Sequence, residues 1–120
     1  MYQWIKGNVY KLVVTMTDSS ITLNNSAANY FSDVRWCLIG IDSDDYKLAI
    51  KPVSKADVDL KLYSMEDLHK VSLGNGYARI SNKSLMSNIA EVIKQPLLNT
   101  KFNASWDDKD NMLIVDLMAN

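Results

Sequence analysis

The stretch Ile41-Asp42-Ser43-Asp44-Asp45-Tyr46-Lys47-Leu48-Ala49-Ile50, IDSDDYKLAI, places three carboxylates within four residues, between two apolar runs. Two interpretations compete for it: a cation-binding loop and the tight end of a β-hairpin. A calcium loop needs a Gly at its sharp bend and a closing bidentate Glu, and this stretch has neither. Asp tolerates turn geometry and accepts hydrogen bonds from its own backbone. The sequence therefore predicts a solvated hairpin turn.

The same pattern recurs near the C-terminus in WDDKDNMLIV, residues 106–115. Upstream of the two turns, ITLNNSA at 21–27 aligns with ARISNKS at 78–84. Both halves follow the order strand, turn, short strand, helix, strand, acidic turn, strand. A second copy of such a unit can supply the apolar surface against which the first copy packs. We therefore predict an internal repeat, residues 10–52 and 69–117, within a single compact domain spanning residues 1–120.

Local signals place hairpins and strands around these turns. Gly74-Asn75-Gly76 permits positive φ and favours a tight hairpin. The apolar runs at 36–41 and 112–117 predict strands that are buried on both faces or lie at a subunit contact. Between the two copies, DVDLKLY at 57–63 alternates in polarity and predicts a further strand, followed by a turn or one helical turn at 64–68.

Each copy also has a predicted helix. Either Asn24 or Asn25 can cap a short helix at 26–31, because its side chain can accept backbone N–H bonds. Ser81 or Asn82 can cap a longer helix, in which apolar residues from Leu85 to Ile93 form one helical stripe. Pro96 is expected to end that helix.

Composition bounds the class of protein. The 120 residues are 48% apolar and 22% charged, as in ordinary globular proteins, with 13 basic and 14 acidic residues for a net charge of −1. This balance argues against a strongly cationic nucleic-acid binder but allows a small basic face.

The single cysteine and the N-terminus indicate a compartment. Cys37 lies in an apolar run, which predicts a buried thiol and fits a reducing environment. Residues 1–7 lack the apolar segment of a signal peptide, and no stretch approaches the ~20 apolar residues of a membrane span. We expect a cytoplasmic protein with no membrane partner.

Signals for catalysis are weak. His69 is the only histidine, the sequence has no Cys/His cluster for a metal, and no Ser-His-acid set is evident. LGNGYAR, residues 73–79, lacks the lysine and spacing of a phosphate-binding loop. We expect no enzyme, no catalytic residue, no metal and no cofactor. Trp36 and Trp106 lie in apolar runs, which favours core packing over base stacking.

The repeated unit resembles the AbrB/MazE/SpoVT swapped-hairpin family. ITLNNSAANYF…CLIGIDSDDYKLAIKP and ARISNKSLMSNIAEVI…FNASWDDKDNMLIVDL carry the resemblance, which covers most of the chain. It implies an α+β fold in which two fused swapped-hairpin (AbrB-like) β-α-β-β units form one pseudo-dimeric, β-rich barrel with short helices. The family often has a proline where strand meets helix, and here Asn24-Asn25 and Asn82-Lys83 stand at those junctions.

The same resemblance implies binding of double-stranded DNA, as a small transcription regulator or as the DNA-binding part of an antitoxin. The basic residues expected nearest the binding face are Lys11, Lys70, Arg79 and Lys83. Such side chains contact phosphates or base edges. The alternative for each of them is a solvated surface cation.

A second function stays open, that of a protein–protein interaction module without DNA binding, such as an antitoxin-like partner or an inhibitor carried by a mobile element. The balanced charge and apolar content favour it. Tyr2, Trp4 and Ile5 are its candidate contacts, because aromatic residues are favoured interface anchors. Homo-oligomerisation is a further open alternative.

Overall fold

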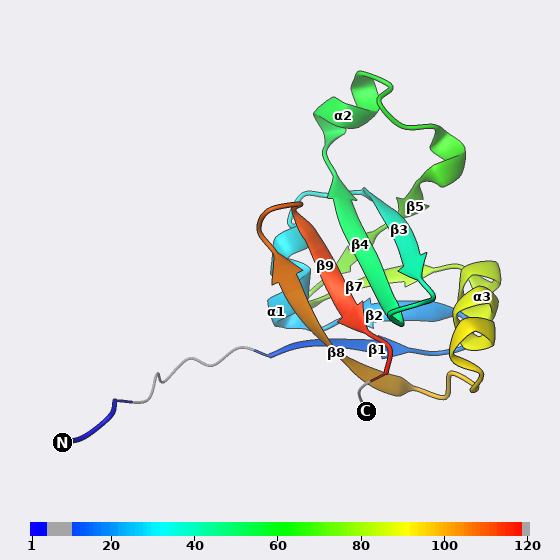
Figure 1. Cartoon of the computed structure of the whole chain (residues 1–120). Coiled ribbons are helices and arrows are strands. Elements are labelled where there is room, and N and C mark those ends of the chain that lie inside the picture. The colour runs from blue at the N-terminus through cyan, green and yellow to red at the C-terminus, as the bar shows by residue number, and fades with distance from the viewer. Residues whose placement is uncertain (5–10, 119–120) are drawn as a thin grey trace.

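The computed structural model describes residues 1–4 and 11–118 (Figure 1). Its main feature is a nine-stranded antiparallel sheet in the order β5-β3-β4-β9-β8-β1-β2-β7-β6. The strands are β1 (Leu12–Met16), β2 (Ser20–Leu23), β3 (Trp36–Asp42), β4 (Lys47–Val53), β5 (His69–Lys70), β6 (Ser72–Gly74), β7 (Tyr77–Ser81), β8 (Thr100–Asp107) and β9 (Met112–Asp116). The helices are α1 (Asn25–Ala28), α2 (Lys55–Asp59), α3 (Lys83–Ile93) and the 3-10 turns η1 (Asn29–Phe31) and η2 (Met65–Asp67).

The sheet curls until its two ends nearly meet. Its terminal strands, β5 and β6, are separated in the chain only by Val71, whose N–H donates to the carbonyl of Arg35 at 2.8 Å. β5 pairs with β3, and β6 pairs with β7. The result is a small, nearly closed antiparallel barrel with a few short helices, which confirms the predicted β-rich α+β class.

The barrel interior is filled by alternating side chains of the strands. Val14 and Met16 of β1 and Leu113 and Val115 of β9 are fully buried, and each strand turns its intervening residues outward. The thiol of Cys37 is buried and free, as expected. No polar or charged residue among the described ones is buried, so the core is held by apolar packing.

The acidic stretches form hairpin turns, as expected from the sequence. The Asp42 carboxylate accepts the backbone N–H groups two and three residues later, at 3.0 and 3.1 Å. Asp107 does the same at 2.9 and 3.2 Å. The residue that closes each turn, Tyr46 or Asn111, is left-handed with φ of 53°. The carboxylates thus replace backbone partners within the turn.

Asparagine caps begin both barrel helices. The Asn24 side chain accepts the N–H of Ala27 at 3.1 Å and starts α1, and the Asn82 side chain accepts the N–H of Leu85 at 3.0 Å and starts α3. α3 ends at Ile93, ahead of Pro96, as predicted.

The strand predicted at 57–63 is wrong. The Ser54 hydroxyl accepts the N–H of Asp57 at 3.1 Å and caps the short helix α2, after which the chain reaches η2. Residues 54–68 form an arm that projects from the barrel (Figure 1). A strand needs a neighbouring strand to satisfy its backbone groups, and the arm has left the sheet. Alternating polarity alone could not show this.

For the strands at 36–41 and 112–117, burial on both faces within the chain is wrong, and the alternative of a subunit contact stays a prediction. In β3 the side chain of Cys37 is fully buried, whereas Gly40 and Ile41 are exposed. β9 alternates between buried and half-buried residues. Each strand covers the barrel core with one face only.

Strand pairing follows a two-fold pattern. The order β, β, helix, β, β occurs from β1 to β4 and again from β6 to β9. β2 pairs with β7 and β4 with β9, and β1 pairs with β8 as β5 pairs with β3. Strands of each half are therefore hydrogen-bonded to strands of the other half.

Candidate nucleic-acid interface

A row of polar side chains crosses the outside of the barrel over five neighbouring strands. Strand register places Lys101, Thr15, Thr22, Arg79 and Ser72 opposite one another in turn, on β8, β1, β2, β7 and β6. Directly opposed residues of antiparallel strands project from the same face. On β1, β2 and β7 the residues on either side of this row are buried, and Lys101 and Ser72 are themselves exposed, so these five side chains face outward. We call them the polar row.

Arg79 is held in place at the middle of this row. Its Nε–H donates to the hydroxyl of Thr22 at 3.3 Å, and its guanidinium carbon lies 5.2 Å from the centre of the Tyr77 ring. Arginine carries five N–H donors in a planar fork. Within residues 11–118, no acceptor bonds its other four N–H groups, so they are directed to an external ligand or solvent.

Charge is unevenly distributed around the barrel despite the net charge of −1. None of the strands β1, β2, β6 and β7, all described in full, contains Asp or Glu, and the nearest acid along the chain is Asp18 in the β1–β2 turn. Most carboxylates lie instead in the two acidic hairpin turns and the arm: Asp42, Asp44, Asp45, Asp57, Asp59, Glu66, Asp67, Asp107, Asp108 and Asp110. A local basic face can therefore exist on this nearly neutral chain.

Two of the predicted DNA contacts lie together. Arg79 and Lys83 line one shallow hollow, with the other polar side chains of the hollow being Ser19, Ser20, Ser81 and Asn82. Lys83 is exposed at the first position of α3, directly after the Asn82 cap. The hollow extends the polar row toward the start of this helix.

Lys70 lies at the far end of the same face. It is exposed on β5, opposite Trp36 of β3, and follows His69 in the chain. Burial lowers the pKa of His69 below its usual value, which keeps the imidazole neutral near pH 7. A neutral Nδ1 can accept the amide N–H of Asn82, which lies 3.4 Å away. This contact ties β5 to the helix cap beside Lys83.

Lys11 does not join this group. Its backbone carbonyl accepts the side-chain N–H of Asn24 at 2.8 Å, and the residue precedes β1. It is four residues from Thr15, a distance of about 13 Å along an extended strand. Lys11 instead lines a second hollow, beside Tyr30 and Trp106.

The sequence alone missed Lys101, Thr15 and Thr22. The alternation in TKFNASW indicates that Lys101 and Asn103 share a face, which is a usable signal. The pairing of β8 with β1, which brings Lys101 into line with Thr15 and Arg79, is a long-range contact that local pattern does not specify.

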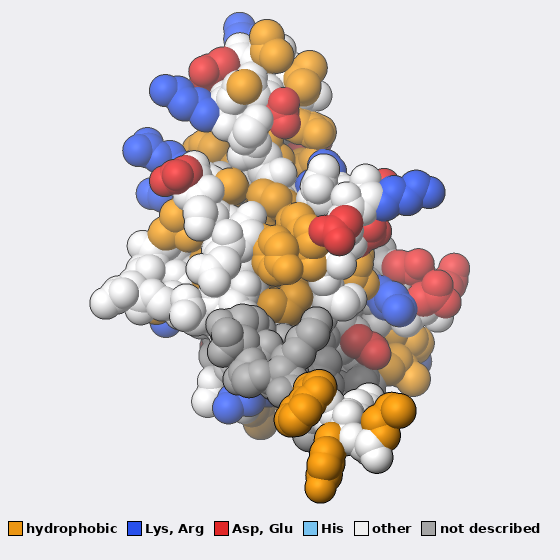
Figure 2. Space-filling view, turned by 90° about the vertical axis from the view of Figure 1, so that its left-hand side faces the viewer, with side chains coloured by type: hydrophobic (Ala, Val, Ile, Leu, Met, Phe, Trp, Pro, Cys, Tyr) orange, Lys and Arg blue, Asp and Glu red, His pale blue; other side chains and the backbone are white. Residues whose placement is uncertain are grey.

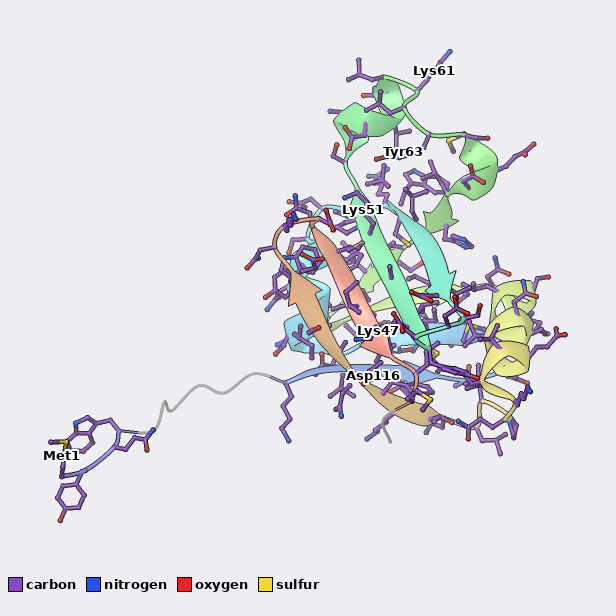
Figure 3. The ribbon with its side chains drawn as sticks, viewed as in Figure 1. Met1, Lys47, Lys51, Lys61, Tyr63 and Asp116 are labelled. Atoms are coloured by element: carbon purple, nitrogen blue, oxygen red, sulfur yellow. The ribbon has the colours of Figure 1, made fainter. Side chains whose placement is uncertain are left out.

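The predicted protein-interface residues lie at the N-terminus. Met1 is far from the barrel in Figure 3, and Tyr2 and Trp4 are 85% and 88% exposed, with their rings 6.3 Å apart. Ile5 lies outside the described residues. Tyr2 and Trp4 are therefore exposed aromatic side chains that do not pack against the described part of the barrel.

The tryptophans of the strands are both half-buried. Trp106 packs against the core and stacks on Tyr30. On the face that Figure 2 shows, hydrophobic side chains gather near the centre, between charged and polar ones. Trp36 lies beside the base of the arm, in a hollow that includes Val53 and Val58. Core packing was expected for both tryptophans; Trp106 packs against the core cluster, whereas Trp36 is half-buried beside the arm.

Comparison with models of protein families, with curated proteins and with solved structures found no match. In the described part of the chain, no helix is both long and apolar enough to cross a membrane. Nor do those residues place three or more His, Cys, Asp or Glu side chains where they could hold a metal ion.

Proposed function

We propose that this protein is a small, non-enzymatic, cytoplasmic DNA-binding protein, an AbrB-like transcription regulator built from two fused swapped-hairpin units. Residues 10–52 and 69–117 are the two units. The polar row and the adjoining hollow form the DNA-binding face, in which Arg79, Lys83, Lys70 and Lys101 are the cations.

The strand pairing supports the fused-unit part of the proposal. β1 of the first half pairs with β8 of the second, and the helix and hairpin contacts cross over as well. Tyr30, which follows α1, stacks on Trp106 at the β8–β9 hairpin. Residues of α3 line a hollow with Ile41 and Tyr46 of the β3–β4 hairpin. The turn after α1 therefore contacts the hairpin of the other half, and α3 borders a hollow with the hairpin of the first half, which supports two units that exchange hairpins.

One observation supports the DNA-binding part of the proposal: Arg79 and Lys101 lie in the same polar row. The five strands of this row contain a single carboxylate, that of Asp107, the last residue of β8. Cationic groups bind phosphates electrostatically, and the hydroxyls of Thr15, Thr22 and Ser72 are groups that commonly bond phosphate oxygens. Arginine held in a fixed position can also bond guanine through two parallel N–H groups. The face thus offers both positioning contacts and one candidate base contact.

The test is a fluorescence anisotropy titration with random duplex DNA and with the DNA upstream of the protein's own gene, at low and physiological salt. We expect binding that weakens with salt by a log–log slope of about −0.9 for each phosphate neutralised. Arg79→Glu with Lys83→Glu should lower affinity at least ~100-fold, because two attractive contacts become repulsive.

The matched control is Lys55→Glu with Lys61→Glu on the arm, where Lys61 projects away from the barrel (Figure 3). It changes net charge by the same amount at a distant place and should retain most of the affinity. Thermal unfolding followed by circular dichroism should be alike for both variants. Equal binding by the two variants, or no binding even at low salt, would overturn the proposal.

The arm favours a second candidate, the protein–protein interaction module. Leu60, Leu62 and Met65 are 70%, 59% and 55% exposed on a segment that stands out from the barrel. Grouped exposed apolar side chains mark interaction sites more often than scattered ones do. Affinity capture should then depend on the arm: replacing all three by Ser would abolish recovery of a partner that the wild type retains. A chain lacking residues 1–7 tests the N-terminal contacts in the same way.

A further inference from the structure

The proposed binding face is centred on two strands whose neighbours follow in the same order on both sides. From β2 the sheet continues to β1 and then β8, and from β7 it continues through the segment 69–74, which comprises β6 and β5, to β3. All these pairings are antiparallel. The two sides of the face are therefore constructed from equivalent elements.

The side chains at equivalent places on the strands differ. Thr22 of β2 lies directly opposite Arg79 of β7 at the centre. On the β2 side, the next outward pair is Thr15 with Lys101. On the β7 side, Ser72 lies opposite Arg79, as Thr15 lies opposite Thr22. Lys70, two residues before Ser72, lies opposite Trp36 of β3, so the two sides carry their cations at different places.

The helices that follow β2 and β7 also differ in charge at their first residue. α1 begins with Asn25 after its Asn24 cap, whereas α3 begins with Lys83 after its Asn82 cap. The β7 side thus has three cations, Lys70, Arg79 and Lys83, and the β2 side has Lys101. Lys101 and Arg79 are three strand spacings apart, on the order of 14 Å, which is comparable with the roughly 12 Å width of the DNA major groove.

We infer that this face binds a non-palindromic segment of duplex DNA in one orientation, with a single chain supplying both sides of the contact. The inference rests on the DNA binding proposed above and adds the symmetry of the ligand. A symmetric homodimer presents two identical surfaces, so its site is a palindrome. One chain with unequal sides has no reason to prefer a palindrome. The side with Lys70, Arg79 and Lys83 forms the stronger set of contacts.

The experiment selects bound sequences from a pool of duplexes with a randomised central segment, using the full chain at low salt. The enriched duplex is then examined by sedimentation velocity and hydroxyl-radical footprinting. We expect a motif without dyad symmetry, one chain per duplex and a footprint that is stronger on one side of its centre. Lys70→Ala should weaken protection on that side, and Lys101→Ala should weaken it on the other.

A gain-of-symmetry variant tests the same idea independently. Thr15→Lys with Asn25→Lys adds two cations on the β2 side, one on β1 and one at the first position of α1, the equivalent of Lys83, on residues that are exposed or half-exposed. The salt slope should steepen by up to about 1.8, from two added contacts, and selection should move toward a more palindromic motif. An unchanged slope and motif would count against the inference.

The remaining outcomes separate the inference from the function on which it rests. A palindromic motif with two chains bound, or retention of DNA with no enriched motif, overturns the inference and leaves DNA binding standing. Failure to retain any duplex at low salt overturns the proposed function itself.

Discussion

Tyr30 stacks on Trp106 with ring centroids 4.2 Å apart and ring planes within 11° of parallel. Phe31, next in the chain, meets the same indole edge to face at 6.5 Å. Tyr30 and Phe31 form the short turn that follows α1, whereas Trp106 lies near the end of β8 in the other half of the chain. This aromatic cluster is therefore a long-range tertiary contact as well as a local patch.

We predict that Tyr30 and Trp106 stabilise the fold jointly. Trp106→Ala should lower the free energy of unfolding by about 2 kcal/mol, and Tyr30→Ala by about 1 kcal/mol, because Trp106 is the larger side chain and packs against the core, whereas Tyr30 is 43% exposed. In a double-mutant cycle measured by urea unfolding, the coupling energy should be about 0.5–1.5 kcal/mol. Leu62→Ala on the exposed arm is the control, with little expected change. Strictly additive effects would show that the stacking contributes nothing beyond burial.

Features determined by neighbouring residues were predictable from the sequence. The acidic turns follow from the ability of Asp42 and Asp107 to bond their own backbone, and the helix starts follow from Asn24 and Asn82. In each case the decisive hydrogen bond spans two or three residues. Local chemistry was sufficient for these elements.

Features determined by distant partners were not predictable. The alternation at 57–63 is that of a strand, but Ser54 caps a helix there, and no strand of the described residues pairs with the arm. The candidate site shows the same limit: the family resemblance puts Arg79 and Lys83 nearest the expected binding face, whereas Lys101 becomes part of the face only through the β1–β8 pairing. The set of strands that surrounds a residue is a global property.

The two acidic turns should be equivalent in their contribution to stability. Asp42→Ala and Asp107→Ala each remove an acceptor of two exposed backbone N–H bonds, so each should cost about 1 kcal/mol in urea unfolding. Asp44→Ala in the same turn should change stability by less than about 0.5 kcal/mol, because its carboxylate accepts no comparable bond from the residues that the structure describes. Because the carboxylates serve the turn, millimolar Ca²⁺ should not raise the melting temperature. A Ca²⁺-dependent rise that is lost in Asp42→Ala would revive the cation-loop interpretation.

His69 should make the fold sensitive to mild acid. Burial lowers its pKa in the folded chain below 6.5, the value of an ordinary histidine. The unfolded chain then binds a proton more readily than the folded one, so stability is fully present above pH 6.5 and declines as pH falls below it. Protonation also removes the Nδ1 acceptor that faces the Asn82 amide. We expect His69→Gln to flatten the stability profile between pH 7 and 5 relative to the wild type, with carboxylate effects common to both. Identical profiles would show that His69 is solvated.

Cys37 should give the fold a matching sensitivity to alkali. Burial raises the pKa of its thiol from 9.0 to about 12, so the folded chain retains a proton that the unfolded chain loses. Stability is therefore complete below pH 9 and falls as pH rises from 9 toward 12, with a slope from this group of up to about 1.4 kcal/mol per pH unit. Cys37→Ala should lower stability at pH 7 by about 1 kcal/mol, through the lost packing of a small side chain, and remove this component of the alkaline slope. Reaction with a thiol reagent at pH 8 provides the direct check: the buried thiol should react at the rate of chain opening, and fast labelling of the native protein would contradict the burial on which the prediction rests.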